Sequence, residues 1–142
     1  MKYTFKIISG LLFISNGIEA ESIEWEYASN LRLGTILLEH KTGEKTSNLS
    51  LGGSIKVQSK PINGLSTGVV FYTTNALFGK NSEAMFLDSN GKSYSIVGEA
   101  YLQGSFGKTA IKIGRQLFES PFMNSDDIGM IPNTVEGYSL LN

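Results

Sequence analysis

Hydrophobic and polar residues alternate along most of this 142-residue chain, in several separate runs. A period of two residues is that of a β-strand, whose successive side chains point to opposite faces of a sheet. The clearest run covers residues 48–59 and predicts a strand with one apolar and one polar face. Its apolar residues are Leu49, Leu51, Ile55 and Val57, and its polar residues are Asn48, Ser50, Ser54, Lys56 and Gln58.

Further runs predict more strands. Residues 65–74, 93–104 and 109–116 alternate clearly, residues 31–40 alternate more weakly, and a sixth strand is expected to begin near Thr134. Residues 21–30 fit no element clearly. In the run 93–104, the pattern puts the following residues on opposite faces: Tyr94, Ile96, Ala100 and Leu102 against Ser93, Ser95, Glu99, Tyr101 and Gln103.

The connections between these runs differ in length in a regular way. Residues 59–65, with Pro61, Asn63 and Gly64, and residues 104–109 are short and rich in turn formers. Residues 74–93 and 116–134 are long. Long strands with short periplasmic turns and longer outside loops are typical of outer-membrane barrels. Because a soluble sheet shows the same alternation, a secreted soluble β-sandwich binding protein remains the alternative.

The first twenty residues have the pattern of a signal peptide. Lys2 and Lys6 precede an apolar run from Ile7 to Ile18, and Ala20 supplies a small residue at the expected cleavage point. The apolar run is shorter than the roughly 20 residues that a transmembrane helix needs. We therefore expect residues 1–20 to direct export and residues 21–142 to form the mature part.

Composition limits the chemistry open to this chain. It has no cysteine and one histidine, so it offers no disulfide, no thiolate metal site and little basis for a catalytic triad. Its net charge of −1 comes from scattered acidic and basic residues, which give no footprint for nucleic acid. The sequence predicts a protein that is not an enzyme and needs no cofactor or metal.

One long stretch carries a family resemblance. Residues 98–116 read GEAYLQGSFGKTAIKIGRQ, and Pro121 and the segment 124–137, NSDDIGMIPNTVEG, follow. Together they resemble the OprD family of outer-membrane porins, and residues 71–74 and 94–100 add weaker similarity. The resemblance implies an all-β fold, an antiparallel transmembrane β-barrel of about eighteen strands. This chain would supply the first five or six, as a truncated N-terminal portion of such a barrel.

The resemblance also implies a function and a location. The family's members are channels in the outer membrane of Gram-negative bacteria, where small hydrophilic solutes diffuse passively. The expected solutes are ions, amino acids, peptides or small carboxylates, and the expected partners are outer-membrane lipid and the barrel-assembly machinery. One residue departs from the family pattern: Gly129 stands where the family loop often has an arginine after its acidic pair.

Two groups of residues are candidates for the channel site. The polar faces of the predicted strands carry Lys56, Glu99, Lys112 and Gln116, which would line the pore and set its electric field. Asp126 and Asp127, in the last long connection, would face solutes at a constriction. The plainer interpretations are a solvated strand face for the first group and turn chemistry for the second.

Overall fold

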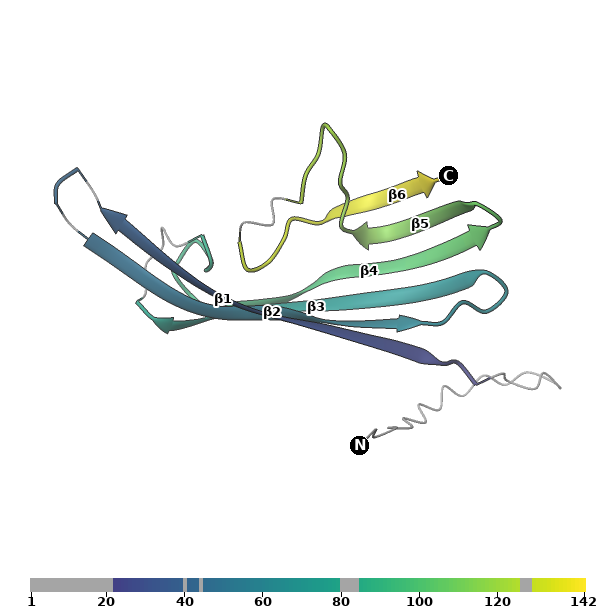
Figure 1. Cartoon of the computed structure of the whole chain (residues 1–142), viewed down its shortest axis with the longest axis horizontal. Coiled ribbons are helices and arrows are strands. Elements are labelled where there is room, and N and C mark those ends of the chain that lie inside the picture. Colours follow the sequence, from purple (N-terminus) through teal and green to yellow (C-terminus); the bar gives the residue numbers. More distant parts are fainter. Residues whose placement is uncertain (1–21, 40, 44, 80–84, 126–128) are drawn as a thin grey trace.

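The computed structural model describes residues 22–39, 41–43, 45–79, 85–125 and 129–142, which form one antiparallel sheet of six strands (Figure 1). The strands are β1 (Trp25–Glu39), β2 (Lys45–Ser59), β3 (Leu65–Phe78), β4 (Tyr94–Phe106), β5 (Thr109–Gln116) and β6 (Val135–Leu141). Each pairs with the next in chain order. The all-β, antiparallel prediction is confirmed, whereas the expected signal peptide, 1–20, lies outside the described residues.

The two short turns form where the sequence predicts them. Ile62 and Leu65 exchange two backbone hydrogen bonds of 2.8 and 2.9 Å around Asn63 and Gly64. Both central residues have positive φ, 53° and 82°, which is the geometry of a type I′ hairpin turn and the reason for Asn-Gly there. Gly107 and Lys108 make the other turn between β4 and β5. Local turn chemistry therefore fixes both hairpins.

The strands are longer than the alternation predicts. β1 begins at Trp25, inside the segment that had no clear assignment, and β3 continues to Phe78. β1 and β2 have 15 residues each and β3 has 14, more than the roughly 9–11 that cross a bilayer at a tilt. The third connection is correspondingly shorter, residues 79–93. None of the described residues forms a helix that is long and apolar enough to span a membrane.

A β-bulge in β4 corrects the predicted faces of that strand. Val70 pairs with Glu99 but the next residue, Phe71, pairs with Val97, so Gly98 is an extra residue on β4. An extra residue reverses which face the following side chains occupy. Tyr94 and Ile96 therefore lie on the same face as Glu99, although the sequence pattern put them on the opposite one.

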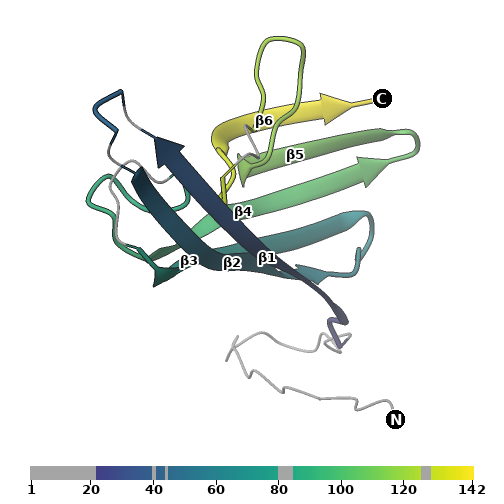
Figure 2. The same ribbon diagram turned by 60° about the vertical axis from the view of Figure 1, so that its left-hand side comes forward.

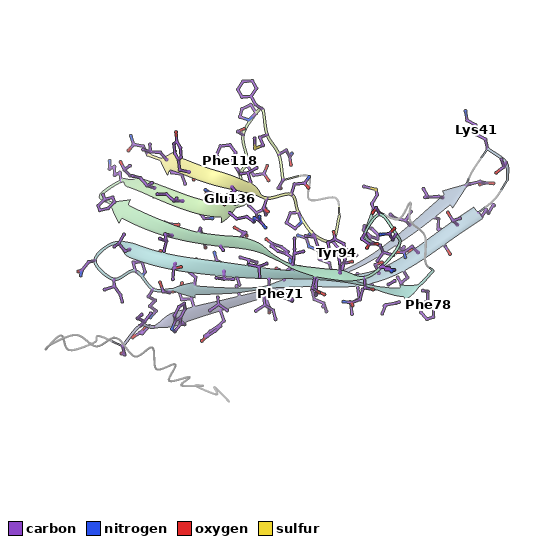
Figure 3. All side chains as sticks on the ribbon, turned by 180° about the vertical axis from the view of Figure 1, so that it is seen from behind. Lys41, Phe71, Phe78, Tyr94, Phe118 and Glu136 are labelled. Atoms are coloured by element: carbon purple, nitrogen blue, oxygen red, sulfur yellow. The ribbon has the colours of Figure 1, made fainter. Side chains whose placement is uncertain are left out.

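The sheet has two chemically different faces. We call the face with Lys56, Glu99, Tyr101 and Lys112 the inner face and the opposite one the outer face. Large apolar side chains stand exposed on the outer face, with Leu31 80% and Leu102 66% exposed. Figure 3 shows Phe71 and Phe78 on this side and Tyr94 on the other. Among the described residues no second sheet covers the outer face, so the β-sandwich alternative is not favoured.

Candidate pore-lining face

A buried carboxylate lies at the centre of the inner face. Glu99 on β4 is 6% exposed. Its Oε1 accepts a hydrogen bond of 2.9 Å from the Tyr72 hydroxyl on β3. Its Oε2 lies 3.5 Å from the Lys112 Nζ on β5 and accepts a hydrogen bond of 3.3 Å from the backbone N–H of Leu117. A buried charge needs such partners to offset the loss of water, and here two strands and the segment that follows β5 supply them.

The Tyr101 ring brings two lysines together. The Lys112 Nζ lies 3.7 Å from the ring centroid and the Lys56 Nζ lies 5.9 Å from it. The tyrosine hydroxyl donates a hydrogen bond of 3.0 Å to Gln58 Oε1. A Cβ on Gly68 would lie 2.5 Å from the ring, so the ring lies directly against the backbone of β3. The π-face attracts both ammonium groups and offsets part of their mutual repulsion.

The Tyr101 hydroxyl can be tested apart from its ring. Tyr101→Phe keeps the ring beneath the lysines and removes the hydrogen bond to Gln58, so we expect a loss of about 0.5–1.5 kcal/mol in the free energy of unfolding. Urea titration of the protein in lipid vesicles measures this. Tyr138→Phe is the control, because Tyr138 stands exposed on the outer face. Equal losses in both variants would show that the bond to Gln58 contributes nothing.

Gln116 shares the inner face but its polar atoms are used within the sheet. Its Nε2 donates to the carbonyl oxygens of Lys112 and Gly137, both at 3.3 Å, and its Oε1 accepts 2.8 Å from the Ser139 hydroxyl. The side chain is buried. Gln116 therefore ties β5 to β6, a role that the sequence does not indicate, and its part in lining a pore stays a prediction.

The structure brings together part of the predicted site. Glu99 and Lys112 are in contact, Lys56 lies near them across Tyr101, and Gln116 is on the same face. Asp126 and Asp127 lie outside the described residues, so their constriction role stays a prediction. The described part of the chain holds no group of three His, Cys, Asp or Glu side chains that could bind a metal ion.

Arg32 is a functional candidate that the sequence analysis missed. Its Nη1 donates a hydrogen bond of 3.2 Å to the carbonyl oxygen of Gly129, although 97 positions separate the two residues. An arginine of β1 thus reaches the loop position at which the OprD-type pattern often has an arginine. The alternation of side chains along the strand could have identified it. Arg32 lies between Leu31 and Leu33, so it points to the inner face when these leucines point outward.

Comparison with known proteins supports the fold and leaves the family open. No protein-family model matches the sequence, and no curated protein matches it significantly. The chain is similar in structure to the crystal structure of Acinetobacter baumannii OccAB1, with a TM-score of 0.66 and 18% sequence identity. The match covers 82% of this chain and 30% of OccAB1, so the chain spans about 30% of the length of that protein. At this identity the likeness shows a shared fold: a six-stranded meander that corresponds to part of a larger β protein.

Proposed function

We propose that this chain forms part of the wall of an outer-membrane channel through which small hydrophilic solutes diffuse passively. The observation that carries the proposal is the contrast between the two faces. A row of exposed leucines on a long sheet would be a liability in water, whereas hydrocarbon favours it. The opposite face gathers charged and hydrogen-bonding side chains, as the wall of a water-filled passage requires.

Two further lines support the proposal. The residues 98–116 and 124–137 resemble OprD-family porins, and the fold resembles OccAB1, which we take to be a channel of the same class. Both support a place in the outer membrane, and this place would require an export signal, the role proposed for residues 1–20. β1 and β6 are the two edge strands of this sheet. In lipid, each backbone N–H or C=O group left without a hydrogen-bond partner along these edges costs several kcal/mol of free energy. We infer that both edges pair with further strands of the barrel.

The inner face suggests how the channel selects solutes. Lys56 and Lys112 bring two positive charges around Tyr101, and Glu99 offsets one of them. Passage is governed by the pore width and by this lining charge, with no chemical step. Amino acids, peptides and small carboxylates fit a passage of this kind, and ions accompany them.

Lys112→Glu tests whether this face borders the water-filled passage. It replaces a positive charge beside Glu99 by a negative one, so we expect the ion preference in planar lipid bilayers to shift toward cations. The measurement is the reversal potential under a salt gradient, on the assembled barrel that contains this sheet, extracted from outer membranes in detergent. Lys108→Glu is the matched control, since it makes the same charge change in the exposed turn of the same hairpin.

The possible outcomes distinguish the lining role of Lys112 from the existence of the channel. A shift in Lys112→Glu that Lys108→Glu does not show supports a pore-lining Lys112. Equal reversal potentials in both variants would contradict the lining role. A wild-type protein that stays monomeric in water without detergent, and gives no current, would overturn the channel itself.

A further inference from the structure

Described parts of the two long connections 79–93 and 117–134, namely residues 85–93 and 129–134, meet over the inner face of β1 and β2. Each places an apolar side chain on the same glycine. A Cβ on Gly34 of β1 would lie 2.7 Å from Met130 Cε and 2.8 Å from Phe86 Cε2. Phe86 belongs to the first connection and Met130 to the second. The two segments touch because Gly34 leaves the space that any larger residue would fill.

Met130 has a second contact on the neighbouring strand. A Cβ on Gly52 of β2 would lie 3.0 Å from Met130 Cβ and 3.1 Å from its Sδ. Gly34 pairs with Ser50, two residues from Gly52, so the seat consists of small residues on two adjacent strands. Met130 is 4% exposed in this position. We call Gly34 and Gly52 the glycine seat.

Hydrogen bonds hold each connection next to the glycine seat. Thr74 of β3, which is fully buried, donates a hydrogen bond of 2.6 Å from its hydroxyl to the Phe86 carbonyl oxygen. Arg32 donates to the carbonyl oxygen of Gly129, next to Met130. The two connections also approach each other directly, because a Cβ on Gly129 would lie 3.4 Å from the Met85 carbonyl oxygen.

The second connection is fastened at its other end too. The backbone N–H of Leu117 donates to Glu99, at the centre of the inner face. The chain thus leaves β5 beside Glu99, is held at Gly129 by Arg32 of β1, and returns to begin β6 at Val135. β5 and β1 are not neighbours in the sheet (Figures 1 and 2). The bond from Arg32 to Gly129 therefore joins the connection that follows β5 to a strand that lies beyond β4, β3 and β2 in the sheet order.

We propose that the glycine seat locks the two long connections to each other, and that Met130 is the positioning residue on which the geometry of both depends. The channel mouth would then have one fixed shape, because neither connection can leave its place without releasing the other. The consequence for the pore rests on the proposed function, whereas the lock itself does not.

A thiol reporter in one connection can detect a change made in the other. The chain has no cysteine, so Leu87→Cys introduces a single thiol at a buried position of the connection 79–93. In detergent-extracted full-length protein, maleimide labelling of this thiol should be slow. Adding Met130→Ala should speed labelling at least about tenfold, because a buried methionine side chain no longer holds the segments closed.

Two variants in the same background make the comparison specific. Met123→Ala removes an exposed methionine of the same connection and should leave the labelling rate at position 87 unchanged. Met130→Leu keeps the apolar volume and should restore slow labelling. Gly34→Leu, which fills the seat from the sheet side, should speed labelling as Met130→Ala does. Gly137→Leu is its control, since a Cβ there meets no atom within 4 Å.

The lock is overturned if labelling at position 87 is equally slow in Met130→Ala and Met123→Ala, or equally fast in both. Recordings in planar bilayers then address the channel. With the lock intact in wild type, Met130→Ala should add current fluctuations that Met123→Ala lacks. If Met130→Ala speeds labelling at position 87 but no variant gives a current, the lock is supported and the channel is contradicted. If the variants give steady currents but Met130→Ala leaves labelling unchanged, the channel is supported and the lock is contradicted.

Discussion

Leu102→Arg is expected to destabilise the membrane-embedded protein by about 2–4 kcal/mol, the cost of a cationic side chain near the middle of the lipid face of a barrel. Leu102 lies on the outer face, paired with Thr67 on β3 and Ile113 on β5. It stands between Val97 and Phe106 in the apolar row that β4 presents on the outer face, and its side chain is largely exposed. Arginine there would have to leave water for hydrocarbon. Exposed leucine on a water-facing surface would tolerate the same change within about 0.5 kcal/mol.

Gln103→Arg is the matched control for Leu102→Arg. It adds the same side chain one position further along β4, and the pleat turns it to the inner face. Because Lys112 lies opposite position 103, the added arginine meets a like charge in the wet inner face, at a cost of about 0.2–1 kcal/mol. We therefore expect a loss of stability well below that of Leu102→Arg. Urea titration in lipid vesicles gives the unfolding free energy, and the heat-modifiable band on gels gives the amount assembled in the outer membrane. If Leu102→Arg were as stable and abundant as Gln103→Arg, the outer face would not contact hydrocarbon.

Local pattern was sufficient to predict the elements that depend on local chemistry. β5 has the bounds that its alternation predicts, 109–116, because turn residues at Gly107 and Lys108 begin it and the alternation stops at the adjacent apolar residues Leu117 and Phe118. The Asn63–Gly64 turn is fixed in the same way. In both cases the interacting residues are only a few positions apart, so a short stretch of sequence is enough to predict the structure.

The elements that depend on partners were predicted less well. Trp25 to Asn30 is polar with two aromatics and shows no regular alternation, yet it is strand because β2 offers a pairing edge from Ser54 to Ser59. The bulge at Gly98 is also a property of a pair, since it exists only in the register of β4 against β3. A single strand cannot reveal it, and the faces predicted for Tyr94 and Ile96 were wrong for that reason.

The candidate site also contains features that local sequence predicts and features that depend on distant partners. Parity put Lys56, Glu99 and Lys112 on one face, and the structure adds that Glu99 and Lys112 are in contact. The bond between Arg32 and Gly129 could not be predicted, because it depends on the path of a long connection over the sheet. The contacts at the glycine seat were not predicted for a similar reason. A glycine inside a strand indicates that another group lies close to the backbone, but it does not identify that group.

Gly114→Ala is expected to cost about 3 kcal/mol in the free energy of unfolding and to separate β4 from β5. Gly114 has a φ of 124°, a conformation that residues with a Cβ rarely adopt, at a cost of order 1–3 kcal/mol. Its Cβ would also lie 2.3 Å from the Ala100 carbonyl oxygen and 3.0 Å from Tyr101 Cα. These are backbone atoms, so no side-chain rotation relieves the clash and the strands themselves must move.

Gly137→Ala is the control that isolates this effect, because Gly137 is the residue opposite Gly114 on β6 and a Cβ there meets no atom within 4 Å. The same methyl group is added to the same strand pair, at a position that has room for it. Gly114→Ala should also loosen the inner face, since Lys112 and Glu99 reach each other only while β4 and β5 stay in register. In urea titrations and planar bilayers we therefore expect lower stability and altered ion preference together in Gly114→Ala, and neither in Gly137→Ala. Stability equal to that of Gly137→Ala would mean that β5 passes β4 less closely than this register requires, and the contact of Lys112 with Glu99 would lose its structural basis.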